Sequence, residues 1–172
     1  GFGKDSINQW NYYLDYGLES QNIWQRAYVS LLGLLPSASP EVIYLQTGFD
    51  DGGQTLSGNC SYTLSGDVPD ARYWSYAIYG NDNYYLQDPN SLVDEPTFED
   101  LFAQVTNGSE ITSIIGENYI ITVDNNLVNQ NATLSHFGND FTLLFRIYGP
   151  NLNYYENPAS IPVASIINQG CK

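Results

Sequence analysis

The chain contains one histidine, His136, and acid–base chemistry centred on an imidazole would depend on it. A catalytic triad needs a serine or cysteine within hydrogen-bond reach of that ring. The neighbouring Ser135 would point to the opposite face of a strand, and no Gly-x-Ser-x-Gly elbow occurs in the sequence. We therefore interpret His136 as a polar surface or hydrogen-bonded residue, and we predict no catalytic residue. An enzyme would need a cleft in which His136 or a pair of carboxylates meets a polar partner.

Metal-binding residues are few in this sequence. One histidine and two distant cysteines do not make a zinc site. Calcium prefers oxygen ligands, which makes the adjacent carboxyls of Asp50 and Asp51 its candidates, although the segment does not match an EF-hand loop. The alternative is a hairpin turn at 50–53, in which Asp and Gly serve the backbone. We predict no metal and no cofactor.

The two cysteines, Cys60 and Cys171, are expected to form one disulfide bond. The bond would close a loop of about 110 residues and stabilise the fold by about 4–5 kcal/mol through chain entropy. Two unpaired buried thiols are the alternative. A disulfide indicates an oxidising compartment, and a chain that lacks Met and begins at Gly1 is expected to have lost a secretory signal. The predicted location is therefore extracellular.

Three Asn-x-Ser/Thr triplets, which are acceptors for N-glycans, begin at Asn59, Asn107 and Asn131. The middle residue of the first triplet is a cysteine, which weakens it as an acceptor. The other two lie in turn-like surroundings, where a side chain points into solvent. We expect covalent N-glycans on the chain; the alternative is that these are ordinary polar turn residues.

Charge excludes several classes of partner. The 172 residues include 19 Asp and Glu against 5 Lys and Arg, which gives a formal net charge of −14 and a pI near 4.1. The charge argues against nucleic acids and anionic membrane surfaces as partners, because binding them requires clustered Lys and Arg. No apolar run approaches the ~20 residues that a membrane span needs. The hydrophobic content of 42% is that of a globular protein, and not that of a disordered acidic tail.

One or two helices are predicted in residues 1–40. The first contains Ile7, Trp10 and Leu14 at helical spacing, and the second begins at a cap on Ser20. This N-terminal helical segment is expected to pack on the rest of the molecule or on a neighbouring subunit.

Residues 41–172 are predicted to form a β-sandwich domain, because the apolar period changes to two after the helical segment. Turns recur at intervals of about ten residues, which is typical of an antiparallel, jelly-roll-like sandwich. A short helix is expected at 96–105. The expected strands are Val42–Thr47, Cys60–Leu64, Tyr73–Tyr79, Tyr84–Leu86, Glu110–Ile115, Tyr119–Val123, Phe141–Tyr148 and Pro162–Ile166. The fold class is therefore mainly β.

The order of several motifs resembles the family named domain of unknown function 1214. The shared pieces are Arg26-Ala27, Ile43-Tyr44-Leu45, Asp50-Asp51-Gly52-Gly53-Gln54-Thr55-Leu56-Ser57-Gly58, Tyr62-Thr63-Leu64, the segment from Pro69 to Tyr79 with its Tyr73-Trp74-Ser75, and Phe141 to Pro150 with its Arg146-Ile147-Tyr148. The resemblance covers about residues 24–167. It implies a jelly-roll-like β-sandwich, and it implies no known reaction.

The sequence departs from the family at two places. The segment Asp88–Leu92 lacks the Arg-Tyr pair that usually follows Asn-Pro, and the segment Leu134–Asn139 stands where Asn-Trp-Leu-Pro is usual. If those pieces form a site in the family, that site is altered here. The departures favour a role carried by the scaffold.

Aromatic residues are abundant, with 15 Tyr and 3 Trp. Adjacent tyrosines on a strand face opposite sides, so some of these rings are expected to meet solvent or a partner. The candidates for an interface or for stacking on sugars are Trp10, Tyr12, Tyr13, Tyr84, Tyr85, Tyr154 and Tyr155.

These features together predict a secreted, N-glycosylated structural protein, a subunit of an extracellular assembly or filament. Its partners would be copies of itself or another extracellular protein. The alternative is an extracellular module that binds carbohydrate or a small ligand.

Overall fold

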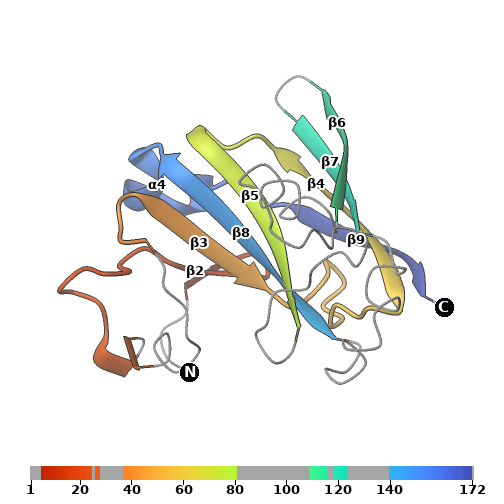
Figure 1. Cartoon of the computed structure of the whole chain (residues 1–172), viewed down its shortest axis with the longest axis horizontal. Helices are drawn as coiled ribbons and strands as arrows, with labels where there is room; N and C mark the ends of the chain where they lie inside the picture. Colours follow the sequence, from red (N-terminus) through yellow and green to blue (C-terminus); the bar gives the residue numbers. More distant parts are fainter. Residues whose placement is uncertain are drawn as a thin grey trace, which may run out of the picture.

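The computed structural model describes residues 5–24, 26–27, 37–80, 109–115, 118–123 and 140–171. It is an antiparallel β-sandwich of two sheets (Figure 1). The five-stranded sheet has, in order, β1 (Asp5–Ile7), β2 (Trp10–Tyr13), β3 (Val42–Thr47), β8 (Phe141–Pro150) and β5 (Ala71–Gly80). The four-stranded sheet has β6 (Ser109–Ile115), β7 (Asn118–Val123), β4 (Cys60–Asp67) and β9 (Ser165–Cys171). Between β8 and β9 lie the short helices α4 (Asn153–Glu156) and η3 (Pro158–Ser160).

The core forms between the two sheets because strands such as β4 and β8 bury apolar side chains at every second position. On β8, for example, Phe141, Leu143, Phe145 and Ile147 are buried while the residues between them are partly exposed. The aromatic centre of this core stacks the ring of Tyr76 on Phe145, with the ring centroids 4.4 Å apart. The mainly β fold and the antiparallel sandwich are confirmed. The strand order alone does not establish the jelly-roll connectivity, which stays a prediction.

The predicted strands are present in the described residues, and β3 has the predicted bounds. The other strands begin or end a few residues from the predicted limits; β9, for instance, begins at Ser165 and not at Pro162. The predicted strand at 84–86 and the predicted helix at 96–105 lie outside the described residues.

The first predicted helix is wrong. Residues 5–13 form the hairpin of β1 and β2, in which Ile7 pairs directly with Trp10. A spacing of three residues is the spacing of one helical turn, but it also separates the two residues that flank a two-residue turn. The turn residue Asn8 has a φ of 52°, which Asn tolerates better than most residues.

Tertiary contacts hold this hairpin in place. The Trp10 indole is 1% exposed and donates a hydrogen bond to the backbone oxygen of Ala164, 2.9 Å away. Of the second predicted helix, residues 23–24 and 26–27 are helical and residues 28–36 lie outside the described part. No helix in the described residues combines the length and the hydropathy of a membrane span.

Candidate functional site: a polar groove and two surface regions

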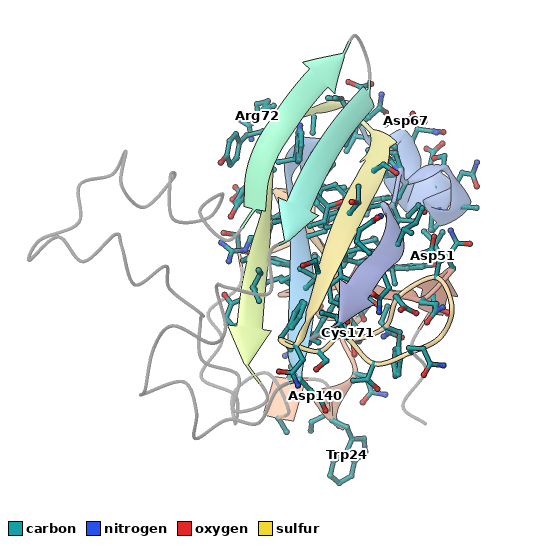
Figure 2. The ribbon with its side chains drawn as sticks, turned by 90° about the vertical axis from the view of Figure 1, so that its right-hand side faces the viewer. Trp24, Asp51, Asp67, Arg72, Asp140 and Cys171 are labelled. Atoms are coloured by element: carbon teal, nitrogen blue, oxygen red, sulfur yellow. A yellow bond between two sulfur atoms is a disulfide. The ribbon has the colours of Figure 1, made fainter. Side chains whose placement is uncertain are left out.

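A groove of about 680 Å³ opens where four segments of the chain meet. They are the β1–β2 turn, the turn after β3, the end of β4 and the segment before β9. The lining residues are Asn8, Gln9, Asp51, Ser65, Gly66, Asp67, Pro162, Val163 and Ser165. Asp51 and Asp67 lie on the same side of the molecule (Figure 2). Of these residues only Asp51 was predicted from the sequence as a candidate ligand, because no local pattern links four segments so distant in the chain.

Asp51 joins the turn after β3 to the start of β9. One carboxylate oxygen accepts a hydrogen bond from the Ile166 N–H, 2.9 Å away, and the other accepts one from the Ser165 hydroxyl. The backbone N–H of Asp51 donates to the Ile166 oxygen, also at 2.9 Å. Three hydrogen bonds therefore fix the wall of the groove that Asp51 and Ser165 form.

Asp50 closes the turn itself. It is buried, and its Oδ1 accepts a hydrogen bond from the N–H of Gln54 at 2.9 Å, while its own N–H donates to the Gln54 oxygen at 2.9 Å. The carboxylates of Asp50 and Asp51 thus serve backbone donors, as in the turn interpretation of this motif. Within the described residues, no three His, Cys, Asp or Glu side chains come together as a metal site would require.

Four groove side chains have no hydrogen-bond partner in the described part of the chain, namely Asn8, Gln9, Ser65 and Asp67. Their amides, hydroxyl and carboxylate offer both donors and acceptors. The groove therefore combines a fixed wall with polar groups that are available to a ligand.

A second region lies on the outer face of the five-stranded sheet, around Arg146. Its guanidinium donates to the Tyr79 hydroxyl at 3.1 Å, and Ser75 stands opposite it on β5. The rings of Tyr73 and Tyr148 are paired beside it, 5.6 Å apart. Burial and the neighbouring Tyr148 raise the pKa of Tyr73, while Arg146 lowers it.

This Arg146 region brings together the Tyr73-Trp74-Ser75 and Arg146-Ile147-Tyr148 motifs. None of its residues was among the candidates from the sequence. The alternation of strand positions could have placed Arg146 and Tyr148 on one face. The alternation could not have predicted that β5 pairs with β8.

The aromatic candidates are divided by burial. Trp10 and Tyr154 are in the core, so neither can stack on a surface sugar or form an interface as predicted. The Tyr154 hydroxyl accepts a hydrogen bond from the N–H of Asp70, 2.8 Å away. Tyr12, Tyr13 and Tyr155 are partly buried, and the predicted roles of these three stay predictions.

Burial also acts on the ionisation of two of these tyrosines. It raises the pKa of Tyr155, which the Ser39 hydroxyl beside it lowers in part. It raises the pKa of Tyr12 as well, and the charge of Asp5 adds to that rise.

The predicted disulfide is present between Cys60 and Cys171, which face each other across β4 and β9 with their Cα atoms 3.9 Å apart. Asn59 precedes it in a turn whose Cys60 N–H donates to the Ser57 oxygen, and the Asn59 side chain is partly exposed. The other predicted glycosylation sites, Asn107 and Asn131, lie outside the described residues. The same is true of Tyr84, Tyr85 and His136.

A third region is apolar and exposed. Ile23 and Trp24 are 74% and 66% exposed, and Leu18 lies nearby in the chain. Trp24 projects away from both sheets (Figure 2). On β9, residues 167–171 are exposed, and the Ile167 side chain is 51% accessible. In the described part of the chain β9 pairs only with β4, so it is an edge strand.

Comparison with known proteins adds a family and a fold. The profile of the family described as "Protein of unknown function (DUF1214)" matches residues 41–152. No curated protein matches the chain.

The crystal structure of the VPA0106 protein from Vibrio parahaemolyticus is similar to this chain, with a TM-score of 0.51 at 19% identity. The likeness covers 82% of this chain and 34% of the Vibrio protein, so the chain spans about a third of that protein's length. At this identity the likeness concerns the fold alone.

Proposed function

The chain belongs to the DUF1214 family, whose activity is unknown, and from this premise we propose that it is a secreted, N-glycosylated structural glycoprotein, a subunit of an extracellular assembly. Copies join head to tail and form a filament. The observation that carries this proposal is the exposure of two large, adjacent apolar side chains, Ile23 and Trp24. A contiguous exposed apolar surface on a soluble domain is typical of a protein–protein contact.

We call the exposed residues Leu18, Ile23 and Trp24 the apolar segment. In the assembly, the apolar segment of one copy binds the β9 edge of the next copy. An edge strand leaves backbone donors and acceptors on one side, and Ile167 adds an apolar side chain there. Because the apolar segment and the β9 edge are different surfaces, the contact is heterologous. A contact of this type that does not close into a ring propagates as a fibre.

Secretion and glycosylation rest on covalent features. The disulfide between Cys60 and Cys171 is compatible with an oxidising compartment. Asn59 stands in a turn with its side chain partly exposed, where a glycan has access.

Electron microscopy of the chain, purified from a eukaryotic secretion host, tests the assembly. We expect polymers for the wild type and their loss in Trp24→Ala and in Ile167→Asp, because a large anchoring side chain contributes tenfold or more in affinity. The matched control is Leu152→Asp, which changes a 65% exposed apolar residue outside both surfaces and should still polymerise. A monodisperse monomer at high concentration, with no polymer in the native source, overturns the proposal.

Intact mass spectrometry tests the covalent part separately. We expect a loss of mass on treatment with an N-glycosidase and a gain of two hydrogens on reduction. Unmodified asparagines in protein from the native source contradict the glycosylation.

A further inference from the structure

We propose that the polar groove between the β1–β2 turn and the start of β9 binds a neutral saccharide. Its volume of about 680 Å³ falls within the range of about 300–1,000 Å³ typical of small-molecule sites. It has room for a short oligosaccharide. This inference does not depend on the proposed assembly, because no groove residue belongs to the apolar segment or to the exposed part of β9.

The polar groups of the groove match a polyhydroxyl ligand. The amides of Asn8 and Gln9 each donate and accept, the Ser65 hydroxyl does both, and the Asp67 carboxylate accepts. A sugar hydroxyl likewise donates and accepts in one group. These four side chains have no competing partner in the described part of the chain.

Apolar surface is also present, since Pro162 and Val163 line the same groove. A pyranose ring carries C–H groups on its faces and hydroxyls around its rim. The Pro162–Val163 surface fits the C–H face, while the four polar side chains fit the rim.

The walls are fixed before any ligand arrives. The Trp10 indole ties the β1–β2 turn to Ala164, and Asp51 ties the turn after β3 to Ser165 and Ile166. A site that does not have to be ordered on binding loses less entropy, so a weakly binding ligand such as a sugar gains affinity.

Charge selects a neutral ligand. Asp51 and Asp67 line the groove in a chain of net charge −14, so phosphates, sulfated sugars and uronic acids are repelled. An apolar ligand would leave the amides of Asn8 and Gln9 and the carboxylate of Asp67 without hydrogen bonds.

Saturation-transfer difference NMR tests the proposal on the full glycosylated chain, and it works for monomers and for large assemblies. The probes are cellobiose, mannobiose, N,N′-diacetylchitobiose and lactose, with glucuronic acid as the anionic control. We expect transfer to at least one neutral disaccharide and none to glucuronic acid. Hydrogen–deuterium exchange with the bound disaccharide should show added protection at residues 8–9 and 65–67.

Two variants link the signal to the groove. Gln9→Ala removes an amide that hydrogen-bonds the sugar, and Asp67→Asn replaces a charged acceptor oxygen by an NH2 group, so each should weaken the apparent affinity by about tenfold. Glu156→Gln removes an exposed acid on α4, outside the groove, and should leave binding unchanged. Trp24→Ala should also bind the sugar normally, which separates this proposal from the assembly.

Three outcomes overturn the proposal. They are the absence of transfer to every neutral probe, protection that falls outside the groove, and equal binding by Gln9→Ala, Asp67→Asn and the wild type. A titration with CaCl2 alone is the remaining arm. If calcium protects residues 65–67 and no saccharide does, the groove is a cation site and the saccharide assignment is wrong.

Discussion

Single side chains in this protein act mainly by holding distant backbone segments together. Asp51, Trp10 and Tyr154 each form a hydrogen bond to a backbone group more than 80 positions away in the sequence. Trp10 and Tyr154 are buried, and a buried polar group that lacks its partner costs about 1–3 kcal/mol, so these two contacts specify the fold as well as stabilising it.

Tyr154 offers a test of this role through pH. Burial raises its pKa above the ordinary value of 10.0, the hydrogen bond from Asp70 N–H lowers it in part, and the Asp70 charge raises it. In the unfolded chain the phenol therefore loses its proton at lower pH than in the folded protein. Its contribution to stability is complete below pH 10 and is lost as the pH rises through the folded-state pKa.

We expect Tyr154→Phe to lower the free energy of unfolding at neutral pH by about 0.5–1.5 kcal/mol, because the hydrogen bond is lost. Above about pH 10 the wild type loses stability as Tyr154 ionises, whereas the Phe variant has no phenol to ionise at this position. The difference in free energy of unfolding between the two proteins therefore narrows. Urea unfolding at neutral and alkaline pH measures both quantities. A gap that widens with pH would contradict the direction of the shift.

Glycines 17 and 53 form a matched pair for backbone strain. Both have positive φ, +73° and +76°, but a Cβ on Gly17 would lie 2.8 Å from the Cβ of Ala38, whereas a Cβ on Gly53 meets nothing within 4 Å. Gly53→Ala should cost about 1–2 kcal/mol, the cost of the left-handed conformation. Gly17→Ala should cost about 1–3 kcal/mol more because of overpacking. Thermal unfolding compares them, and equal losses would mean that the approach of Ala38 is not a constraint.

At the scale of elements, the strand periodicity could be predicted where a strand buries one face, as β4 and β8 do. The period of two in Phe141–Pro150 directly indicates which side chains are in the core. The hairpin of β1 and β2 could not be distinguished from a helix, because Ile7 and Trp10 satisfy both patterns. Tertiary contacts decide between them, namely the pairing of β2 with β3 and the hydrogen bond of Trp10 to Ala164.

The groove could not be predicted for a related reason. The groove exists because the end of β4 lies next to the β1–β2 turn, and no local sequence pattern predicts that these two segments are neighbours. The disulfide could be predicted since the chain has only two cysteines, and it joins one end of β4 to one end of β9.

Strand β9 is held at both ends by different means. Asp51 binds Ser165 and Ile166 at its start, and the disulfide binds Cys171 at its end. We expect Cys60→Ala combined with Cys171→Ala to lose about 2–5 kcal/mol of stability. Amide exchange should accelerate at 168–171 and much less at 165–166.

Asp51→Ala removes the other anchor and should reverse this pattern. Amide exchange should accelerate at 165–166, while the disulfide keeps exchange slow at 168–171. Uniform exchange along β9 in both variants would show that the strand opens as one unit, and that the two anchors are not independent.

For the whole molecule, net charge opposes the proposed assembly. Each copy carries a formal charge of −14 at pH 7, so two copies repel until the charge is screened or neutralised. Salt shortens the range of this repulsion to about 8 Å at physiological ionic strength. Acidification towards the pI of 4.1 protonates carboxylates and lowers the net charge of each copy, which also weakens the repulsion.

Assembly should therefore increase with added salt and as the pH falls from 7 towards 5, as measured by light scattering and sedimentation. Trp24→Ala distinguishes the specific contact from simple precipitation near the pI. If the apolar segment makes the contact, the variant stays monomeric under conditions in which the wild type assembles, because lowering the repulsion cannot replace the missing anchor. Equal association of the two proteins at every pH and salt concentration would show that general charge neutralisation causes the association, and that the apolar segment is not part of the interface.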